Sequence, residues 1–553
     1  MQKFCKQCDV SFEVTDDDLL FLDKISPSFA GKKYLIPAPD FCASCRLQRR
    51  MLFRNERSLY KRKCDGTGKS ILAAFPEDSK YKVHEHDYWW SDKWDAINYG
   101  KDFDFNKTLT EQLNALVIEV PHINLNSIGC ENSDYVNYFI NSKNSYLTFG
   151  GAHNEDCMYS KFLNHSKNIL DGLSLSACEF CYEGNFSEGC YSCRYFVNCR
   201  NCSECTLIEE CQGCKNCMAC FGLKNKEYYV LNKFVGKEEF QKFADYCKIM
   251  SRSKLKELKE KLANLKKDLP HVQSHIYASE DSTGDMILNS KNCKNCFDIK
   301  ECENCENMNF APKSVNSKDA CYSAPGPMSF GYQLCSTIGM ENSMANFYTW
   351  YGGGNLYYCL ECMTCTDCFA CVGLRNKQYC VLNKQYTKEE YEDLVGKIIE
   401  KFKEWGQFLD PELSFFAYNE TVAQEHFPLT KEQALKLGFS WRDNEEKQYQ
   451  ASNYPIPELI TEVGDDILGE IFACQDCAKN YKILAEELKF YKLMGVPIPL
   501  KCHNCRHSDR MDLRRFFKLY TRECAKCSAK IKTIYSPDRS EIVYCHQCYL
   551  NET

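Results

Sequence analysis

The stretch FCASCRLQRRMLFRNERSLYKRKC, residues 41–64, decides the fold, because it recurs near the other end of the chain. The second copy reads KCHNCRHSDRMDLRRFFKLYTREC, residues 501–524, and aligns without a gap, cysteine opposite cysteine and arginine opposite arginine. The match extends upstream, where FCKQC at residues 4–8 aligns with ACQDC at residues 473–477. One cysteine-rich module therefore occurs twice, once toward each end of the sequence, and it brackets everything between.

The paired cysteines of these modules have the spacing of zinc ligands. A CxxC turn supplies two thiolates from one tight backbone knuckle, and two such turns complete a tetrahedral structural zinc site. The alternatives are buried structural thiols or a redox CxxC pair, but isolated redox motifs do not come as two spaced pairs inside duplicated modules. We predict three zinc ions, held by Cys5, Cys8, Cys42 and Cys45; by Cys474, Cys477, Cys502 and Cys505; and by Cys524, Cys527, Cys545 and Cys548.

The N-terminal copy has a degenerate second ribbon. Alignment with one single-residue gap leaves only Cys64 in common and places Thr67, His84 and Asp87 opposite Cys527, Cys545 and Cys548. Loss of the metal with retention of the fold is favoured on ligand count. Tryptophans that follow would then replace the metal as a small apolar core: Trp89, Trp90 and Trp94. A mixed fourth site is the alternative, drawn from Cys64, His84, His86 and Asp87.

A second duplication fills the centre. CMACFGLKNKEYYVLNKFVGKEEF, from Cys217, recurs as CFACVGLRNKQYCVLNKQYTKEEY, from Cys368. Nearby cysteines recur in multiples of three among short units such as SKN, VNC and KNC, without the long amphipathic periods of helices. Such short units favour a β-solenoid with small side chains in inward ladders. We interpret these thiols as core packing, with extra zinc or an iron–sulfur cluster as the alternative.

These duplications predict a multidomain α+β protein. Treble-clef or zinc-ribbon-like modules at both ends flank two repeated β-solenoid-like units, with connecting helices between them. The expected order is an N-terminal zinc module with the degenerate ribbon (1–100), a first Cys-rich unit (125–235), a helical connector (236–270), a second Cys-rich unit (271–385), a helix and linker (386–470) and a C-terminal double zinc module (471–553). In the linker, Thr430 and Gln433 fit a capping box, which predicts a short helix at 431–437.

Composition bounds the class of protein. The chain has 553 residues, 44% of them hydrophobic, and 39 cysteines, most of them in CxxC pairs. An odd cysteine count in a long chain favours metal binding in a reducing cell, and no stretch is apolar enough for a signal core or a membrane span. We expect a cytoplasmic protein without a membrane partner. No catalytic constellation stands out, so we expect no enzyme activity.

Basic residues crowd the strip after each CxxC pair, although the net charge of the chain is −7. Arginines interleaved with aromatic residues suit phosphate contacts and base stacking. Arg46 and Arg506, directly after the CxxC pairs, are assigned mainly to structure. The remaining candidates for nucleic-acid contact are Arg49, Arg50, Arg57, Lys61, Arg510, Arg515 and Lys518. Pairing of these charges with acidic groups inside the protein, or with a protein partner, is the alternative.

Long motifs also carry a family resemblance. The end modules resemble the bacterial "probable zinc-ribbon" module, and nearly the whole chain resembles a conserved zinc-ribbon protein family of unknown function from candidate-phyla-radiation bacteria. The motifs that carry the resemblance are FRNERSLYKRKC, YWWSDKWD, GLRNKQYCVLNKQYTKEEY, YNETVAQEHFPLTKEQA and EIVYCHQCY. The resemblance implies zinc at the cysteine quartets and no particular activity. The chain departs from that family at Thr67, His84 and Asp87, where members tend to keep cysteines.

The leading functional hypothesis is a non-enzymatic multi-zinc adaptor that binds RNA or a ribonucleoprotein through the basic strips. A protein–protein scaffold without nucleic acid is one rival. A redox or metal-handling protein that uses the central thiols is the other.

Overall fold

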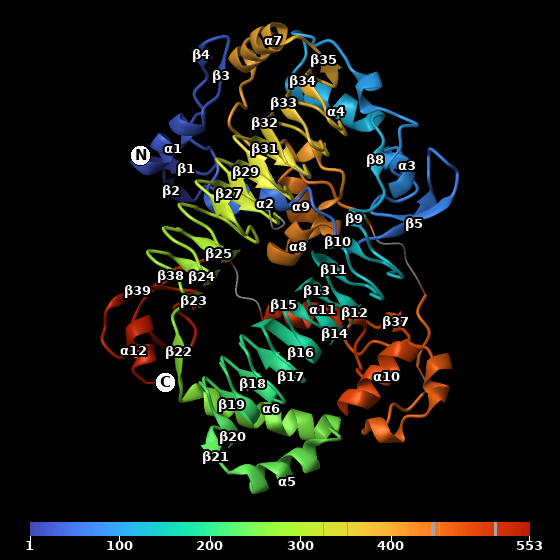
Figure 1. The fold of residues 1–553 in the computed structure, drawn as a ribbon, viewed down its shortest axis with the longest axis vertical. Helices are drawn as coiled ribbons and strands as arrows, with labels where there is room; N and C mark the ends of the chain where they lie inside the picture. The colour runs from blue at the N-terminus through green and yellow to red at the C-terminus, as the bar shows by residue number, and fades with distance from the viewer. Residues whose placement is uncertain (324–325, 351, 444–447, 453, 514–516, 553) are drawn as a thin grey trace.

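The computed structural model describes residues 1–553 except 324–325, 351, 444–447, 453, 514–516 and 553. Two stacks of short parallel strands occupy the middle of the molecule, and the cysteine-rich modules lie against them (Figure 1). The protein is thus α+β, with cysteine quartets near both ends of the chain. None of the helices in the described ranges is both long and apolar enough to span a bilayer.

The first stack is built from thirteen strands, and all its strand pairs are parallel except the last. Its strands are β9 (Ser127–Ile128), β10 (Asn137–Ile140), β11 (Phe149–Ala152), β12 (Glu155–Met158), β13 (Lys161–Asn164), β14 (Lys167–Leu170), β15 (Leu173–Ser176), β16 (Glu179–Glu188), β17 (Arg194–Val197), β18 (Thr206–Glu209), β19 (Lys215–Phe221), β20 (Glu227–Val230) and β21 (Lys233–Phe234).

The second stack repeats this plan. Its strands are β23 (Ile276–Tyr277), β24 (Gly284–Leu288), β25 (Cys296–Lys300), β26 (Ser314–Val315), β27 (Lys318–Cys321), β28 (Met328–Ser329), β29 (Tyr332–Cys335), β30 (Met340–Glu341), β31 (Met344–Phe347), β32 (Gly353–Tyr357), β33 (Thr366–Phe369), β34 (Gln378–Val381) and β35 (Lys384–Gln385).

Each coil of the first stack is twelve residues long. Asn137 pairs with Phe149, Phe149 with Lys161, and Lys161 with Leu173, always in parallel register. Amides at the corners form ladders with the same period, as where the Nδ2 of Asn132 donates to the Oδ1 of Asn144, twelve positions on. The twelve-residue period therefore holds for the backbone pairing and for the side-chain ladders.

Within a coil, every third residue has left-handed backbone geometry. Tyr195, Asn198, Asn201 and Glu204, for example, have φ of 59°, 53°, 50° and 54°. An isolated non-glycine residue rarely adopts this conformation, although Asn and Asp tolerate it best. Here the parallel pairing above and below imposes it on residues of many kinds.

The residue after each left-handed corner points into the stack, and this explains the cysteines. The Cys202 thiol donates to the carbonyl of Arg200 at 3.4 Å, two residues earlier, and Cys178 does the same to Ser176 at 3.4 Å. The Ser142 hydroxyl makes the equivalent bond to Ile140 at 2.9 Å. Cysteine and serine thus share one role, a small inward side chain that donates to a buried carbonyl.

The modules at the two ends share one plan in two halves. The first half is a knuckle hairpin followed by two helices; the second half is another knuckle hairpin, a short strand and a short helix. The N-terminal module has β1 (Gln2–Phe4), β2 (Ser11–Glu13), α1 (Asp16–Ile25), β3 (Ser28–Phe29), β4 (Lys32–Lys33), α2 (Ala43–Met51), β5 (Tyr60–Lys63), β6 (Ser70–Ala73), β7 (Val83–His84) and α3 (His86–Trp90). The C-terminal module has β36 (Phe472–Ala473), β37 (Asn480–Tyr481), α10 (Ala485–Met494), α11 (His503–Asp512), β38 (Tyr520–Glu523), β39 (Lys530–Thr533), β40 (Ile542–Tyr544) and α12 (His546–Leu550).

Helices and short strands connect these parts. They are α4 (Leu109–Glu119), β8 (His122–Ile123), α5 (Lys237–Cys247), α6 (Arg252–Lys267), β22 (Pro270–Val272), α7 (Lys388–Lys401), α8 (Val422–His426) and α9 (Lys431–Lys436). The predicted capping box is confirmed: the Thr430 side chain accepts from the Gln433 N–H, and the Gln433 side chain accepts from the Thr430 N–H. Helix α9 therefore begins where the sequence predicts.

Each module contacts both stacks, and the two modules do so with the roles of the stacks reversed. In the N-terminal module, α2 packs on β27 and β29 of the second stack, while β7 pairs with β8 at the entry of the first. In the C-terminal module, α11 packs on the first stack through Asp171, while β40 pairs with β22 at the entry of the second. Each module therefore joins the two stacks by contacting both of them.

Candidate metal centres and the cleft between the stacks

Three quartets of cysteines come together as predicted, and each could hold a metal ion. They are Cys5, Cys8, Cys42 and Cys45; Cys474, Cys477, Cys502 and Cys505; and Cys524, Cys527, Cys545 and Cys548, with all sulfur atoms of a quartet within 4.8 Å of one another. Among the described residues, no group of central cysteines converges in this way.

The quartet geometry suits a tetrahedral ion. One Sγ–Sγ distance per quartet is 3.8 Å (Cys8–Cys42), 3.7 Å (Cys477–Cys502) and 3.9 Å (Cys527–Cys545). Four sulfur atoms about 2.3 Å from a tetrahedral Zn²⁺ would be roughly 3.8 Å apart. The donor set and its spacing therefore fit the group.

Local hydrogen bonds lower the pKa of one thiol in each of two quartets, whereas the pKa of other members, among them Cys45 and Cys505, is raised. A hydrogen bond from the Cys45 thiol outweighs burial and lowers the pKa of Cys42 to about 5. Burial raises the pKa of Cys474, but backbone N–H groups of Cys502, Cys477 and Asp476 more than offset it, and the pKa falls to about 6. Because the thiolate is the metal-binding form, both shifts favour metal at neutral pH.

The degenerate ribbon keeps the backbone of its partner without the ligands. The Glu85 N–H donates to the Cys64 sulfur at 3.2 Å, as the Cys545 N–H does to Cys524, also at 3.2 Å. The two ribbons therefore align without a gap, which corrects the predicted equivalence. The positions opposite Cys527, Cys545 and Cys548 are Thr67, Glu85 and Tyr88, in place of Thr67, His84 and Asp87.

Aromatic rings take up the space at this degenerate site. The Tyr88 ring lies so close to the knuckle that a Cβ atom on Gly66 would be 2.4 Å from its Cε1. His84 packs edge-on against Tyr88 and Trp94, and Trp89 is fully buried. The possible ligand atoms of Cys64, His84, His86 and Asp87 do not lie close enough together to hold a metal ion.

Arginines that follow the CxxC pairs form ion pairs with one buried aspartate in each stack. Arg46 and Arg50 contact Asp319 of the second stack, with shortest N–O distances of 2.9 and 3.4 Å. Asp319 is 1% exposed and lies 273 residues from Arg46. A carboxylate buried between two guanidinium groups joins the N-terminal module to this stack.

The C-terminal module repeats the contact on the first stack. Arg506 and Arg510 contact Asp171 at 2.9 and 2.7 Å, and Asp171 is fully buried. Arg46 and Arg506 also donate to carbonyls of their own modules, those of Phe41 and Lys501, as expected for structural arginines.

These contacts correct the assignment of Arg50 and Arg510 to nucleic-acid binding. Arg50 and Arg510 are buried on aspartates and have no surface from which to contact a phosphate. Arg49 packs over the Phe41 ring, and Arg57 lies over Phe149 and donates to Asn504. Lys61 and Lys518 are exposed, and Arg515 lies outside the described residues.

A buried charge network fills the junction between the modules and the first stack. Lys161, fully buried, contacts Glu56 at 2.7 Å and also Glu425 of α8. Glu56 in turn accepts from Arg54 at 2.6 Å. Breaking such a network by removing one member leaves an unpaired buried charge, so the junction is held in one arrangement.

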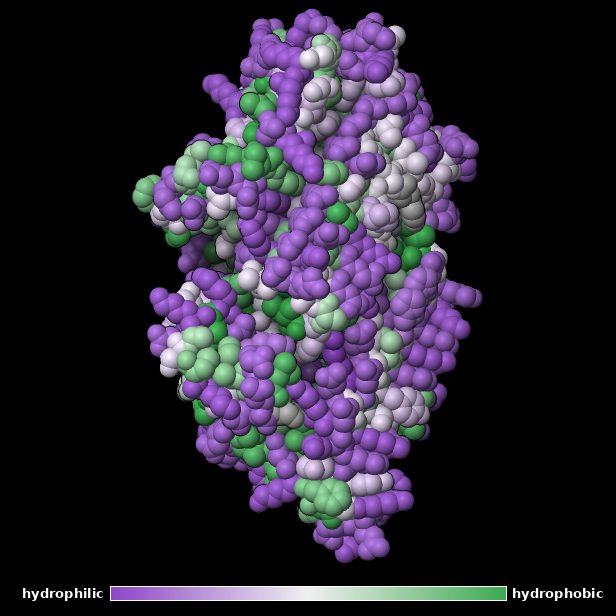
Figure 2. Space-filling view, turned by 60° about the vertical axis from the view of Figure 1, so that its left-hand side comes forward, coloured by the Kyte–Doolittle hydropathy of each residue, from purple (hydrophilic) through white to green (hydrophobic). Residues whose placement is uncertain are grey.

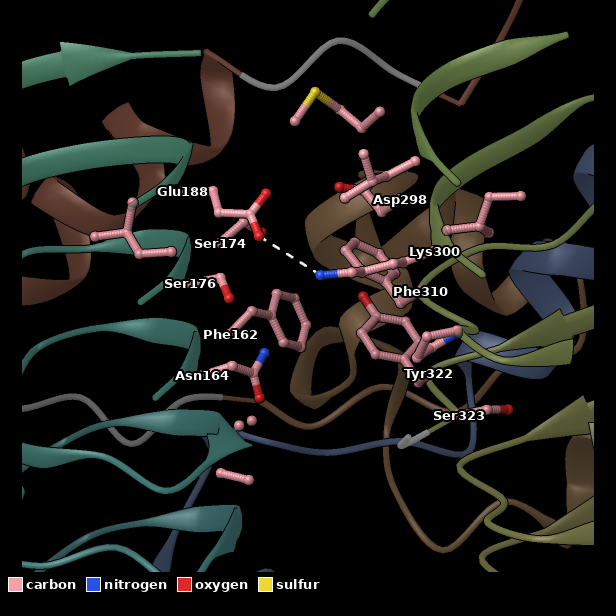
Figure 3. A pocket seen from close by; sticks show the side chains of 18 of the residues that line it. Phe162, Asn164, Ser174, Ser176, Glu188, Asp298, Lys300, Phe310, Tyr322 and Ser323 are labelled. Atoms are coloured by element: carbon pink, nitrogen blue, oxygen red, sulfur yellow. Dashed lines mark hydrogen bonds and ion pairs between the residues drawn. The ribbon is translucent and has the colours of Figure 1, made fainter. Parts of the chain in front are cut away.

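A cleft of about 500 Å³ separates the stacks, and residues of both stacks line it. Figure 3 shows Phe162, Ser176 and Glu188 from the first stack facing Lys300, Phe310 and Tyr322 from the second. The Phe162 and Phe310 rings meet with centroids 4.8 Å apart. Sequence reasoning missed this cleft, as it missed Asp171 and Asp319, because no local motif marks a surface formed by two distant segments.

Comparison with known proteins does not show a family for this chain. No family model matches the sequence, and no curated protein matches it. Among solved structures, a proposed acetyltransferase from Desulfovibrio desulfuricans G20 is 8% identical, with a TM-score of 0.11, over 50% of this chain and 80% of that one. The resemblance to a zinc-ribbon family thus stays an expectation from sequence.

Proposed function

We propose that the protein is a non-enzymatic binding scaffold, in which zinc-stabilised modules hold two β-solenoid units at a fixed separation around a cleft. The four-thiolate donor sets support zinc as the ion, because soft sulfur ligands in tetrahedral geometry favour it over harder cations. The twelve-residue parallel register supports the solenoid assignment. Intracellular zinc modules of this kind act as structural supports.

The observation that carries the proposal is the coupling of each first-half quartet to a stack. Cys42 and Cys45 begin helix α2, Arg46 follows directly, and Arg50 lies one turn later on the same face. A metal that fixes the first turn of α2 therefore also aims both guanidinium groups at Asp319. The same relation links Cys502 and Cys505 to Asp171 through α11.

The face of the molecule shown in Figure 2 favours the cleft, rather than a broad surface patch, as the binding region. On the face shown in Figure 2, hydrophilic residues dominate and apolar residues form small separate patches. Large contiguous apolar patches are the usual mark of a protein-docking surface. A partner RNA or ribonucleoprotein remains a weaker candidate, because among the residues assigned to it only Lys61 and Lys518 are exposed in the described ranges.

The proposal is tested by metal analysis together with aspartate substitutions. We expect three zinc ions per chain. Asp319→Asn and Asp171→Asn should each retain all three ions and lower the free energy of unfolding by about 3–5 kcal/mol, because two buried arginines lose their carboxylate.

Asp281→Asn is the matched control, since Asp281 has the same left-handed backbone but is exposed. Asparagine tolerates that backbone, so all three variants keep the local geometry. One zinc ion or none per chain, or equal stability of the three variants, would contradict the proposal.

A further inference from the structure

The cleft lies between equivalent positions of the two stacks. Asn137 and Asp285 accept equivalent backbone hydrogen bonds, from the N–H groups of Asn126 and His275, at the start of their stacks. Counting coils from these two residues makes Phe162 and Phe310 equivalent. Their rings pack against each other at a tilt of 32°, so two equivalent positions form an aromatic floor to the cleft.

The walls above this floor are not equivalent. Gly150, Ala152 and Ser174 of the first stack correspond to Asp298, Lys300 and Tyr322 of the second, and all six line the cleft. Ala152 and Ser174 are small side chains on one wall, and Lys300 and Tyr322 are larger ones on the other, while the Phe162 ring takes up the space beside Gly150. The two walls of the cleft therefore differ in side-chain size.

One loose ion pair spans the mouth of the cleft. Glu188 of the first stack and Lys300 of the second are 3.5 Å apart, and their side chains are 36% and 45% exposed (Figure 3). Exposed pairs of this kind contribute little to stability, so other charged groups can replace either partner. Its two charges, one of each sign, match a ligand that carries both.

We infer that the cleft binds a small zwitterion with a flat apolar ring, the class that includes aromatic amino acids and their dipeptides. The ligand's carboxylate would pair with Lys300, its ammonium with Glu188, and its ring would pack on Phe162 and Tyr322, whose ring centroids are 5.6 Å apart. A pocket of this volume suits a ligand of dipeptide size. The inference rests on the proposed function, because the modules set the width of the cleft.

Isothermal titration calorimetry with L-phenylalanyl-L-phenylalanine tests the assignment, with the N-acetylated, C-amidated and cyclic forms as arms that remove the ammonium, the carboxylate or both. We expect the zwitterion to bind about tenfold tighter than either singly blocked form, the factor for one lost charged hydrogen bond. Glu188→Gln should abolish the penalty for N-acetylation only, and Lys300→Met the penalty for C-amidation only.

Ser174→Phe should block the cleft and abolish binding. The second stack already carries Tyr322 at the equivalent position, with the same left-handed backbone, so the fold accepts a ring there. Ser192→Phe, at another left-handed corner away from the cleft, is the control and should bind normally.

No binding of the zwitterion at 5 mM, equal binding of the cyclic form, or unchanged binding by Ser174→Phe would each overturn the inference. Zinc content and melting temperature are measured on the same samples. Lack of binding by a protein that holds three zinc ions refutes the ligand assignment alone, whereas lack of zinc refutes the scaffold itself.

Discussion

The second halves of the two modules have one backbone and two different cores. In each ribbon a backbone N–H, that of Glu85 or of Cys545, donates to the first knuckle cysteine at 3.2 Å. Each ribbon also has a 2.9 Å backbone hydrogen bond at the equivalent place, from the Asp65 N–H to the Val83 carbonyl or from the Ala525 N–H to the Val543 carbonyl. In the C-terminal ribbon, four thiols lie together at the centre. The N-terminal ribbon has the Tyr88 ring there, packed edge-on against His84.

This difference shows that a small ribbon needs a core but does not need a particular kind. A metal supplies that core through strong bonds in a domain too small to bury much apolar surface. The N-terminal ribbon instead borrows surface from its neighbours: Trp89 donates to the Pro121 carbonyl, and Arg375 of the second stack lies over the Trp89 and Trp94 rings. With zinc in the C-terminal quartet, as proposed, metal dependence in one ribbon corresponds to dependence on the stack in the other.

The strongest test of this comparison replaces the one cysteine that both ribbons share. Cys524→Ser should lose one zinc ion per chain and unfold the C-terminal ribbon, because binding free energy on the order of 10 kcal/mol is coupled to its folding. Cys64→Ser, at the equivalent position, should change neither zinc content nor the ribbon. Elemental analysis and limited proteolysis measure both effects, and a zinc ion lost from Cys64→Ser would show that the N-terminal ribbon also holds metal.

A second test removes the buried ring at equivalent positions. Trp89→Ala should lower the free energy of unfolding by about 3–5 kcal/mol, because Trp89 is fully buried and leaves a large cavity. Tyr549→Ala should cost less, since the quartet beside Tyr549 still holds its ribbon. Denaturant unfolding at saturating zinc compares the two, and equal losses would argue against a metal core.

The smallest expected effect concerns acid sensitivity. Burial lowers the pKa of His84 to about 4, below the value of about 6.5 for an unfolded chain. The stability that comes from keeping His84 neutral is complete above pH 6.5 and is lost as the pH falls toward 4, because the unfolded state takes up the proton first. His84→Tyr, the residue of the other ribbon, should therefore reduce the fall in melting temperature between pH 7 and pH 5 by roughly 2–4 °C. An unchanged pH profile would assign the acid sensitivity to other groups.

Sequence reasoning succeeded where ligands are close in sequence and chemically distinctive. The CxxC pairs predicted all three quartets. The cysteine spacing in multiples of three indicated inward ladders, but not the constant coil length of the first stack. Serine, glycine, leucine and phenylalanine also fill inward positions, which hides the period.

The arginines illustrate what one sequence does not reveal. A charge run reads the same whether its partners are phosphates or carboxylates, and the partner of Arg50 lies in another domain. Asp171 and Asp319 look like any of the Asn and Asp residues at left-handed corners. Only the packing of α11 and α2 onto these two corners, which depends on the whole topology, distinguishes them. The gap placed in the degenerate ribbon failed for a related reason, since Glu85 and Tyr88 keep no chemical trace of the cysteines they replace.

The twelve-residue coil also makes the length of the cleft adjustable in whole units. Neighbouring coils meet in parallel register, with side-chain ladders of the same period, so adding or losing one coil would move the remaining ones by a single strand spacing, about 4.8 Å. The second stack includes a longer coil, because Lys318 pairs in parallel register with Tyr332, fourteen residues on. Gene duplication and slippage could thus lengthen the two walls coil by coil, and substitutions at wall positions such as 174 and 322 could then reshape the space between them without disturbing the thiol-lined interiors.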